Sequence, residues 1–236
     1  MTPYYDRDGI TIYHGDCRDV LPTLGRECVD LLVTDPPSEV VWRGGKQAKR
    51  FAVMAGNDAG GVWLEGVEAA VRVLRTHRHL YVFGPFDLSP LPICSPVELI
   101  WDKGQFNAGN HTIPWAPQHE RIQFAVRVSP GAKLSGGAGR LTARLRRGSV
   151  LRYPRLNAGA VTRHPTEKPV GLLRELIESS SCIGETVIDP FVGVGSTLVA
   201  AMIEGRRAIG IEIDEHYCEI AAKRLAQSAM VLPDAG

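Results

Sequence analysis

The 236-residue sequence has few of the features that mark membrane-spanning, secreted or disordered proteins. No stretch reaches the roughly 18 uninterrupted apolar residues of a membrane helix, and the start, MTPYYDRDGI, lacks the basic-then-apolar layout of a signal peptide. The five cysteines are an odd number without a C-x-x-C pair, which argues against a disulfide framework and a structural zinc site. With 44% hydrophobic and 22% charged residues the composition is that of a globular protein. We therefore expect a cytoplasmic protein with no metal and no membrane anchor.

Positive charge is concentrated in one part of the chain. The whole sequence carries 27 basic and 26 acidic residues. Between Trp101 and Arg163 there are 11 basic residues against two acidic ones, or +9, so the remainder has 16 basic and 24 acidic residues, or −8. A basic segment on an otherwise acidic protein is typical of a polyanion-binding element. We expect this segment to contact nucleic acid, and a solvated surface loop is the alternative.

Apolar runs alternate between the spacing of strands and the spacing of helices. Val29–Thr34 is a short apolar run followed by prolines, as expected of a buried strand. Further strands are expected over 79–83, 97–101, 123–128, 186–189 and 207–213, and helices over 61–76, 168–181, 196–204 and 215–227. This alternation predicts an α/β fold with a doubly wound parallel sheet, which binds ligands at the carboxyl ends of its strands.

The first candidate site is the glycine-containing turn DPFVGVGSTL at 189–198, between an expected strand and an expected helix. Small residues let a ligand approach the backbone, and a helix N-terminus offers free N–H groups. Leu198 replaces the third glycine of the dinucleotide fingerprint, which argues against an ordinary NAD site. The next strand ends near Glu212, whose carboxylate can accept hydrogen bonds from both hydroxyls of a ribose. The pair predicts a nucleoside ligand; helix capping is the alternative for Glu212 and the preferred role of Asp214.

The second candidate site is the strand end Thr34-Asp35-Pro36-Pro37-Ser38. Two consecutive prolines stiffen the backbone and remove two N–H donors, which leaves the Pro36 carbonyl and the Asp35 carboxylate as paired acceptors. Such a pair suits an amino group. A turn that only ends the strand is the alternative.

Taken together, these segments resemble the S-adenosylmethionine-dependent DNA amino-methyltransferases, which modify adenine N6 or cytosine N4. Asp35-Pro36-Pro37 precedes the D-P-F-x-G-x-G segment, as in the beta class of that family, whose motif order is permuted. His164-Pro165-Thr166-Glu167-Lys168-Pro169 is close to the family's H-P-T-x-K-P, and Gly15-Asp16-Cys17 resembles its G-D-C segment. Shorter matches occur at 99–104 and 118–120, and the resemblance covers roughly residues 12–226.

The resemblance implies a Rossmann-like methyltransferase sheet with circularly permuted motifs, and it gives each motif a role. The implied catalytic residues are Asp35, Pro36, Pro37 and Ser38. The residues implied to hold S-adenosylmethionine are Asp16, Cys17, Thr166, Lys168, Asp189, Phe191, Gly193, Gly195 and Glu212. In this set Glu212 would bind the ribose, Asp16 and Cys17 would lie near the adenine ring, and Thr166 and Lys168 near the methionine carboxylate. A helix N-cap is the alternative for the T-E-K-P segment.

The resemblance also divides the chain into three parts: a catalytic half at 1–103, a basic target-recognition insertion at 104–160 and an S-adenosylmethionine-binding half at 161–236. In the insertion, Arg140, Arg144, Arg146 and Arg147 are expected to contact double-stranded DNA. Resembling enzymes often form dimers, so a homodimer is an open alternative.

The expected chemistry follows from the weakness of an aromatic amine as a nucleophile. Hydrogen bonds from both amine protons to the Asp35 carboxylate and the Pro36 carbonyl would favour a pyramidal nitrogen, exposing its lone pair for in-line attack on the methyl group. The target base must leave the duplex stack, which costs a few kcal/mol. Asp35 stands where many cytosine-directed relatives have serine, which favours adenine N6 over cytosine N4.

One residue departs from the family pattern, because Ser38 follows the two prolines where the family has an aromatic ring that stacks on the base. Such stacking is worth roughly 1–3 kcal/mol, so binding or rate would fall by one or two powers of ten. Trp42 and Phe51 are candidates to replace the ring. Two other functions stay open: a non-catalytic DNA-binding relative, and a methyltransferase that acts on RNA or a protein amide.

Overall fold

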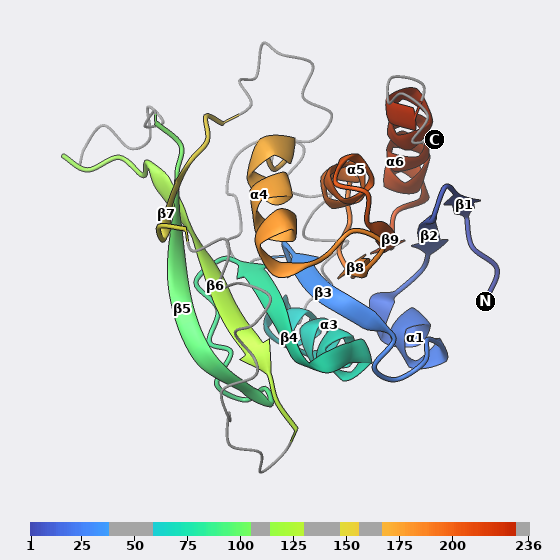
Figure 1. Ribbon diagram of the computed structural model, residues 1–236, viewed down its shortest axis with the longest axis horizontal. Coiled ribbons are helices and arrows are strands. Elements are labelled where there is room, and N and C mark those ends of the chain that lie inside the picture. The colour runs from blue at the N-terminus through green and yellow to red at the C-terminus, as the bar shows by residue number, and fades with distance from the viewer. Residues whose placement is uncertain (38–58, 105–113, 130–146, 156–166, 230–236) are drawn as a thin grey trace.

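The computed structural model describes residues 1–37, 59–104, 114–129, 147–155 and 167–229, and these form one sheet with helices on both faces (Figure 1). The helices are α1 (Cys17–Val20), the short 3₁₀ helix η1 (Leu21–Thr23), α3 (Ala59–Val73), α4 (Val170–Ser180), α5 (Ser196–Ile203) and α6 (Glu215–Ala229). The strands are β1 (Tyr5–Arg7), β2 (Ile10–His14), β3 (Val29–Thr34), β4 (Leu74–Phe83), β5 (Ile93–Asp102), β6 (His119–Arg127), β7 (Val150–Arg152), β8 (Thr186–Asp189) and β9 (Arg207–Glu212). Their order across the sheet is β1-β2-β9-β8-β3-β4-β6-β5-β7.

The sheet is mostly parallel, with two exceptions. Strands β2, β9, β8, β3 and β4 run parallel to one another, whereas β6 lies antiparallel between β4 and β5, and β1 is antiparallel to β2. The predicted α/β fold with a doubly wound, mostly parallel sheet is confirmed, and the antiparallel directions of β1 and β6 were not predicted. An apolar run marks a strand without giving its direction, and antiparallel neighbours need no helical crossover.

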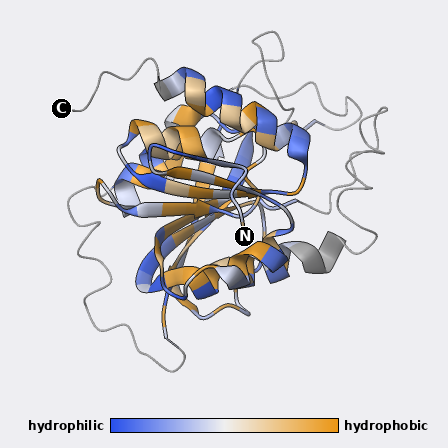
Figure 2. Ribbon diagram, turned by 90° about the vertical axis from the view of Figure 1, so that its right-hand side faces the viewer, coloured by the Kyte–Doolittle hydropathy of each residue, from blue (hydrophilic) through white to orange (hydrophobic). Residues whose placement is uncertain are grey.

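Residue alternation along the buried strands supplies two cores, one on each face of the sheet. On β3, Leu31 and Val33 point into one core and Leu32 into the other. Helices α4, α5 and α6 cover the first face, and α1 and α3 cover the second (Figures 1 and 2). Continuously apolar strands such as β3 are therefore explained by burial on both sides.

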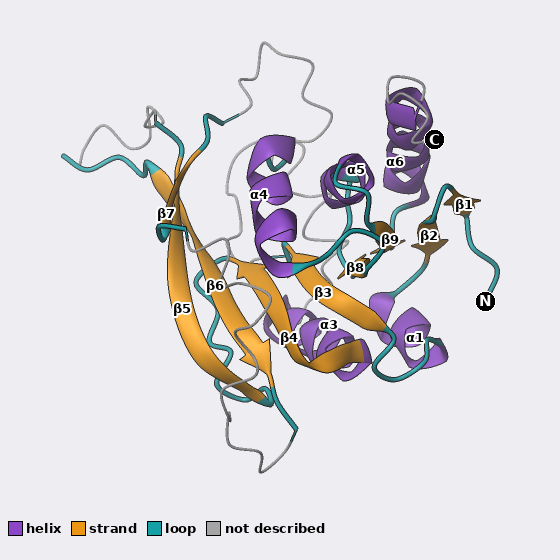
Figure 3. Ribbon diagram, viewed as in Figure 1, coloured by secondary structure: helices purple, strands orange, loops and turns teal. Residues whose placement is uncertain are grey.

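The expected elements are present (Figure 3) and differ from the predictions at their ends. The structure also has elements that were not predicted, namely β1, β2, α1, η1 and β7. Helix α3 ends at Val73, three residues before the end of the predicted range, and β4 begins at Leu74. Leu74 packs in the same core as Val67 and Val71, so its apolar character continues the helical pattern although its backbone already belongs to a strand. Strands β5 and β6 both begin four residues earlier than predicted, at Ile93 and His119.

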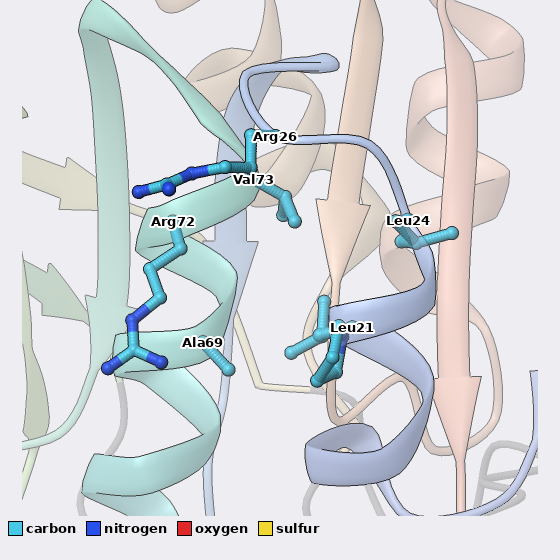
Figure 4. A pocket seen from close by; sticks show the side chains of 7 residues that line it. Leu21, Leu24, Arg26, Ala69, Arg72 and Val73 are labelled. Atoms are coloured by element: carbon cyan, nitrogen blue, oxygen red, sulfur yellow. The ribbon is translucent and has the colours of Figure 1, made fainter.

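A hollow of about 340 Å³ lies beside the last turns of α3 (Figure 4). Its lining residues are Leu21, Pro22, Leu24, Arg26, Ala69, Arg72 and Val73. Arg26 and Val73 precede β3 and β4, so the hollow lies at the amino end of these strands and not at the edge where ligands of such sheets bind. None of the helices in the described ranges is long and apolar enough to cross a membrane.

Candidate active site

The two motifs predicted from separate parts of the chain meet at the carboxyl edge of the sheet. Asp35 follows β3, and Asp189 ends β8, the strand that pairs with β3 in parallel. The Thr34 hydroxyl donates a hydrogen bond of 2.9 Å to Asp189 Oδ1. A direct contact therefore joins the Asp35-Pro36-Pro37 strand end to the glycine-containing turn.

The turn between β8 and α5 is shaped by two glycines with left-handed backbone conformations. Gly193 has φ of 52° and Gly195, the N-cap of α5, has φ of 83°. A Cβ at Gly195 would lie 2.9 Å from the Ala221 Cβ, so packing against α6 requires the glycine. A Cβ at Gly193 would meet nothing within 4 Å, which leaves open space beside the backbone where a ligand can approach. Asp189 Oδ1 also accepts from the Phe191 N–H at 3.1 Å and fixes the start of the turn.

Glu212 lies at the end of β9 and faces this turn. Its carboxylate is 8% exposed and accepts hydrogen bonds from the backbone N–H groups of Gly193 (2.8 Å) and Asp214 (3.0 Å). Burial raises the pKa of the Glu212 carboxyl, and these hydrogen bonds oppose that effect. Each carboxylate oxygen keeps a further lone pair, so the group can also accept from ribose hydroxyls. Asp214 accepts from the His216 N–H at 2.9 Å, which agrees with its predicted capping role at the start of α6.

Asp16 and Cys17 lie next to this end of the sheet, since the Gly15 N–H donates to the Glu212 carbonyl at 2.9 Å. Asp16 caps α1 by accepting from the Arg18 N–H at 2.8 Å, and its carboxylate also pairs with the Arg18 guanidinium at 2.6 Å. The hydrogen bond from Arg18 holds the pKa of Asp16 below its usual value. Burial raises the pKa of the Cys17 thiol to about 12, so this side chain is neutral. The Asp16 carboxylate, expected to accept from an adenine amine, is thus engaged by Arg18.

Lys168 contacts Asp35, a different partner from the methionine carboxylate expected for it. Its ammonium donates to Asp35 Oδ2 at 2.6 Å and lies 3.3 Å from Glu120 Oε2. Lys103, at the end of β5, donates to the other oxygen of Glu120 at 2.5 Å. Both ammonium groups lie over aromatic rings: Lys168 is 5.2 Å from the Phe83 ring centroid, and Lys103 is 5.1 Å from that of Trp101.

These contacts form a compact network of two cations and two anions at the carboxyl edge. Lys168 and Lys103 are each 9% exposed, so both ammonium groups are almost removed from water. Burial alone would lower the pKa of Lys168, but Asp35 and Glu120 outweigh it and raise the pKa, so Lys168 is protonated. Burial raises the pKa of Asp35, and the Lys168 ammonium opposes the rise. Burial also raises the pKa of Asp189, to about 6.

Several predicted site residues fall outside the described ranges: Ser38, Trp42, Phe51, Arg140, Arg144, Arg146 and Thr166. Arg147 is described, and its guanidinium pairs with Glu175 at 3.1 Å and with Glu178, both on α4. The candidate DNA contact therefore already has two acidic partners within the chain. Among the described residues, no group of three or more histidine, cysteine and acidic side chains is arranged to hold a metal ion.

Glu120 and Lys103 are site residues that sequence reasoning missed. Both lie in stretches that matched the family, at 118–120 and 99–104, but neither stretch was given a role. Their order in the sequence does not show that the start of β6, with Glu120, meets the end of β5, with Lys103. That meeting depends on the antiparallel pairing of β6 with β5.

Comparisons with known proteins match the chain to DNA methylases. The family model N6_N4_Mtase, described as DNA methylase, matches residues 55–223. The DNA adenine methyltransferase YhdJ of Escherichia coli (strain K12) is 27% identical over 254 residues, covering 94% of this chain and 84% of that protein. The type II methyltransferase M.ScaI of Streptomyces caespitosus is 25% identical over 281 residues, covering 98% and 86%.

Solved structures share the fold. The cytosine-N4-specific PvuII DNA methyltransferase matches with a TM-score of 0.68 at 15% identity, over 99% of this chain and 90% of that chain. The structure of M1.HpyAVI in complex with S-adenosylmethionine matches with a TM-score of 0.63 at 22% identity, over 92% of this chain and 100% of that chain.

Proposed function

The chain belongs to the N6/N4 DNA methylase family, and from this premise we propose that it transfers a methyl group from S-adenosylmethionine to adenine N6 in double-stranded DNA. The observation that carries the proposal is the joining of Asp35 to the glycine-containing turn through the Thr34–Asp189 hydrogen bond. This contact supports the proposal because it brings the strand end that carries Asp35 next to the turn in which a Cβ at Gly193 would meet nothing within 4 Å.

The residues around the turn fit S-adenosylmethionine. The open space at Gly193 admits a ligand to the backbone, and the buried Glu212 carboxylate has lone pairs for ribose hydroxyls. Asp189, Phe191 and Gly195 complete this side of the site. When bound, S-adenosylmethionine supplies an electrophilic methyl group on a sulfonium. The carboxylates of Asp35, Asp189 and Glu212 all lie at this edge of the sheet, so their negative potential favours such a cation.

Asp35 and Pro36 are proposed to bind and orient the amine of an extruded base. Asp35 Oδ2 is occupied by Lys168, and within the described part of the chain Oδ1 has no hydrogen-bond partner. Oδ1 and the Pro36 carbonyl can then accept the two amine protons, which favours a pyramidal nitrogen with its lone pair exposed. The aspartate in place of serine supports adenine N6 as the target, and cytosine N4 is the alternative within the same family.

Expression in methylation-deficient cells, followed by mass spectrometry of the nucleosides of their DNA, tests this proposal. We expect N6-methyladenine with the wild type. The Asp35→Asn variant keeps the size of the side chain but replaces the anionic acceptor, so the rate of methyl transfer should fall by about 100-fold or more, in the range typical for loss of one preorganised group.

The affinity for S-adenosylmethionine, measured by calorimetry, should stay within a few-fold in Asp35→Asn. Asp6→Asn is the matched control, because Asp6 is an exposed residue of edge strand β1 whose carboxylate accepts from Thr11. N4-methylcytosine in place of N6-methyladenine would reassign the target atom. Cofactor binding without any methylated base would instead favour a non-catalytic relative, and a preference for RNA over duplex DNA would contradict the proposed substrate.

A further inference from the structure

The contact between Lys168 and Asp35 joins segments that are 133 residues apart in the chain. Lys168 lies just before α4, while Asp35 follows β3 on the sheet that α4 covers. The ammonium donates to one carboxylate oxygen only, at 2.6 Å. A one-sided hydrogen bond of this kind fixes the rotation of the carboxylate and determines which oxygen faces away from the lysine.

Lys168 is itself held from several sides. Glu120 lies 3.3 Å from its ammonium, and the Phe83 and Trp101 ring centroids lie at 5.2 Å and 6.0 Å. Lys103 in turn holds the other oxygen of Glu120. Because Phe83, Trp101 and Glu120 lie on three different strands around it, the Lys168 ammonium has little freedom to move away from Asp35. Such restraint is expected of a group that orients a reacting side chain.

We propose that Lys168 is a positioning residue for Asp35: it holds Oδ2 and thereby presents Oδ1 to the amine of the target base, while Glu120 and Lys103 hold Lys168 in place. This inference rests on the proposed function and deepens it. It also gives Lys168 a different role from binding the methionine carboxylate of the cofactor, which the family resemblance implies.

The charged groups around Asp35 have opposite effects on the pKa of its carboxyl: the lysines lower it and the acidic groups raise it. Lys168, before α4, and Lys103, after β5, favour the carboxylate form of Asp35. Glu120, on β6, opposes it as a like charge, and Asp189, on β8, is a further acidic neighbour. Removing the Lys168 charge should therefore raise the pKa of Asp35, whereas removing the Glu120 charge should lower it.

The experiment measures single-turnover methyl transfer to duplex DNA at saturating S-adenosylmethionine from pH 5 to pH 9. Lys168→Met keeps the length and apolar stem of the side chain; we expect a maximal rate about 10- to 100-fold below the wild type and an acidic limb shifted up by about one pH unit. Glu120→Gln keeps an oxygen that can accept from the two lysines but removes the like charge beside Asp35, so the acidic limb should shift downward. Lys168→Arg should restore part of the rate and return the limb toward the wild type.

Lys168→Met leaves two carboxylates without their shared cation, so its folding is checked by urea unfolding. If it does not fold, the double variant Lys168→Met/Glu120→Gln removes the repulsion. Its acidic limb should lie above that of Glu120→Gln alone, because the two differ only in the lysine.

The results separate the two proposals. A wild type that methylates no duplex DNA contradicts the proposed function itself. An active wild type for which Lys168→Met weakens S-adenosylmethionine binding, but keeps the maximal rate and the acidic limb, overturns the positioning role and returns Lys168 to the methionine carboxylate.

Discussion

Asp35 and Asp189 are two acidic residues at neighbouring strand ends whose surroundings make them different acids. Asp35 faces the Lys168 ammonium at 2.6 Å. Asp189 is 3% exposed and is held by the Thr34 hydroxyl and the Phe191 N–H, both neutral donors. Neutral hydrogen bonds compensate a buried charge less well than a cation does, and this explains why burial raises the pKa of Asp189 to about 6. A sulfonium beside the turn would add the missing positive charge.

The raised pKa of Asp189 predicts a stability that depends on pH. Because the folded-state pKa of about 6 exceeds the ordinary value of 3.8, the stabilising contribution is complete below pH 3.8 and is lost as the pH rises through about 6. Between pH 4.5 and pH 7.5 this loss is about 2 kcal/mol. Asp189→Asn cannot ionise but keeps an oxygen that accepts from Thr34 and Phe191.

Urea unfolding of both proteins without cofactor measures this effect. The free energy of unfolding of Asp189→Asn, relative to the wild type, should increase by about 2 kcal/mol from pH 4.5 to pH 7.5. A difference that does not change with pH would show that Asp189 ionises in the folded protein as it does in the unfolded chain.

At the scale of elements, the sequence predicts the strand ends of the site better than it predicts the contacts between them. Strands β3, β8 and β9 are apolar runs that end at polar residues, so Asp35, Asp189 and Glu212 could be placed at one edge of the sheet before the structure was known. The partner of Lys168 could not, because an ion pair between distant segments depends on how α4 packs and on which acidic groups reach it first. The direction of β6, which brings Glu120 to the site, could not be predicted either, because an apolar run does not give the direction of a strand.

The β8–α5 turn allows a matched pair of glycine substitutions. In Gly195→Ala, the new side chain has to adopt a left-handed backbone conformation and also clashes with Ala221. The free energy of unfolding should therefore fall by about 2–4 kcal/mol. In Gly193→Ala the strain acts without a clash, so the loss should be about 1–2 kcal/mol. Its new methyl group nevertheless fills the open space beside the turn, and the affinity for S-adenosylmethionine should fall about tenfold or more.

Urea unfolding and calorimetric titration with S-adenosylmethionine are measured on both variants. Wild-type affinity in Gly193→Ala would mean that the ligand does not approach the backbone at this residue. Equal losses of stability in the two variants would contradict the distinction drawn from packing against α6.

Across the whole molecule, the uneven charge of the sequence is partly balanced by ion pairs in the fold. Five basic residues in the described part of the segment 101–163 have acidic partners, three of which lie outside that segment. These pairs are Lys103–Glu120, Arg121–Glu98, Arg127–Glu27, Arg147–Glu175 and Arg152–Asp102. A count of charges along the chain therefore overstates the positive charge available to DNA, because side chains from distant segments neutralise part of it.

The salt dependence of DNA binding distinguishes paired from available arginines. Each phosphate contact contributes about 0.9 to the slope of log K against log salt concentration. If Arg140, Arg144 and Arg146 each contact one phosphate, the triple change to glutamine should make the slope shallower by about 2.7.

Arg147→Gln is the matched control: its guanidinium is engaged by Glu175 and Glu178, so the slope should stay that of the wild type. Duplex binding is measured by fluorescence anisotropy between about 50 and 200 mM salt, a range over which several phosphate contacts change the affinity by orders of magnitude. A slope reduced by Arg147→Gln as much as by one of the other arginines would mean that Arg147 leaves α4 to bind a phosphate, and an unchanged slope in the triple variant would place the phosphate contacts elsewhere on the chain.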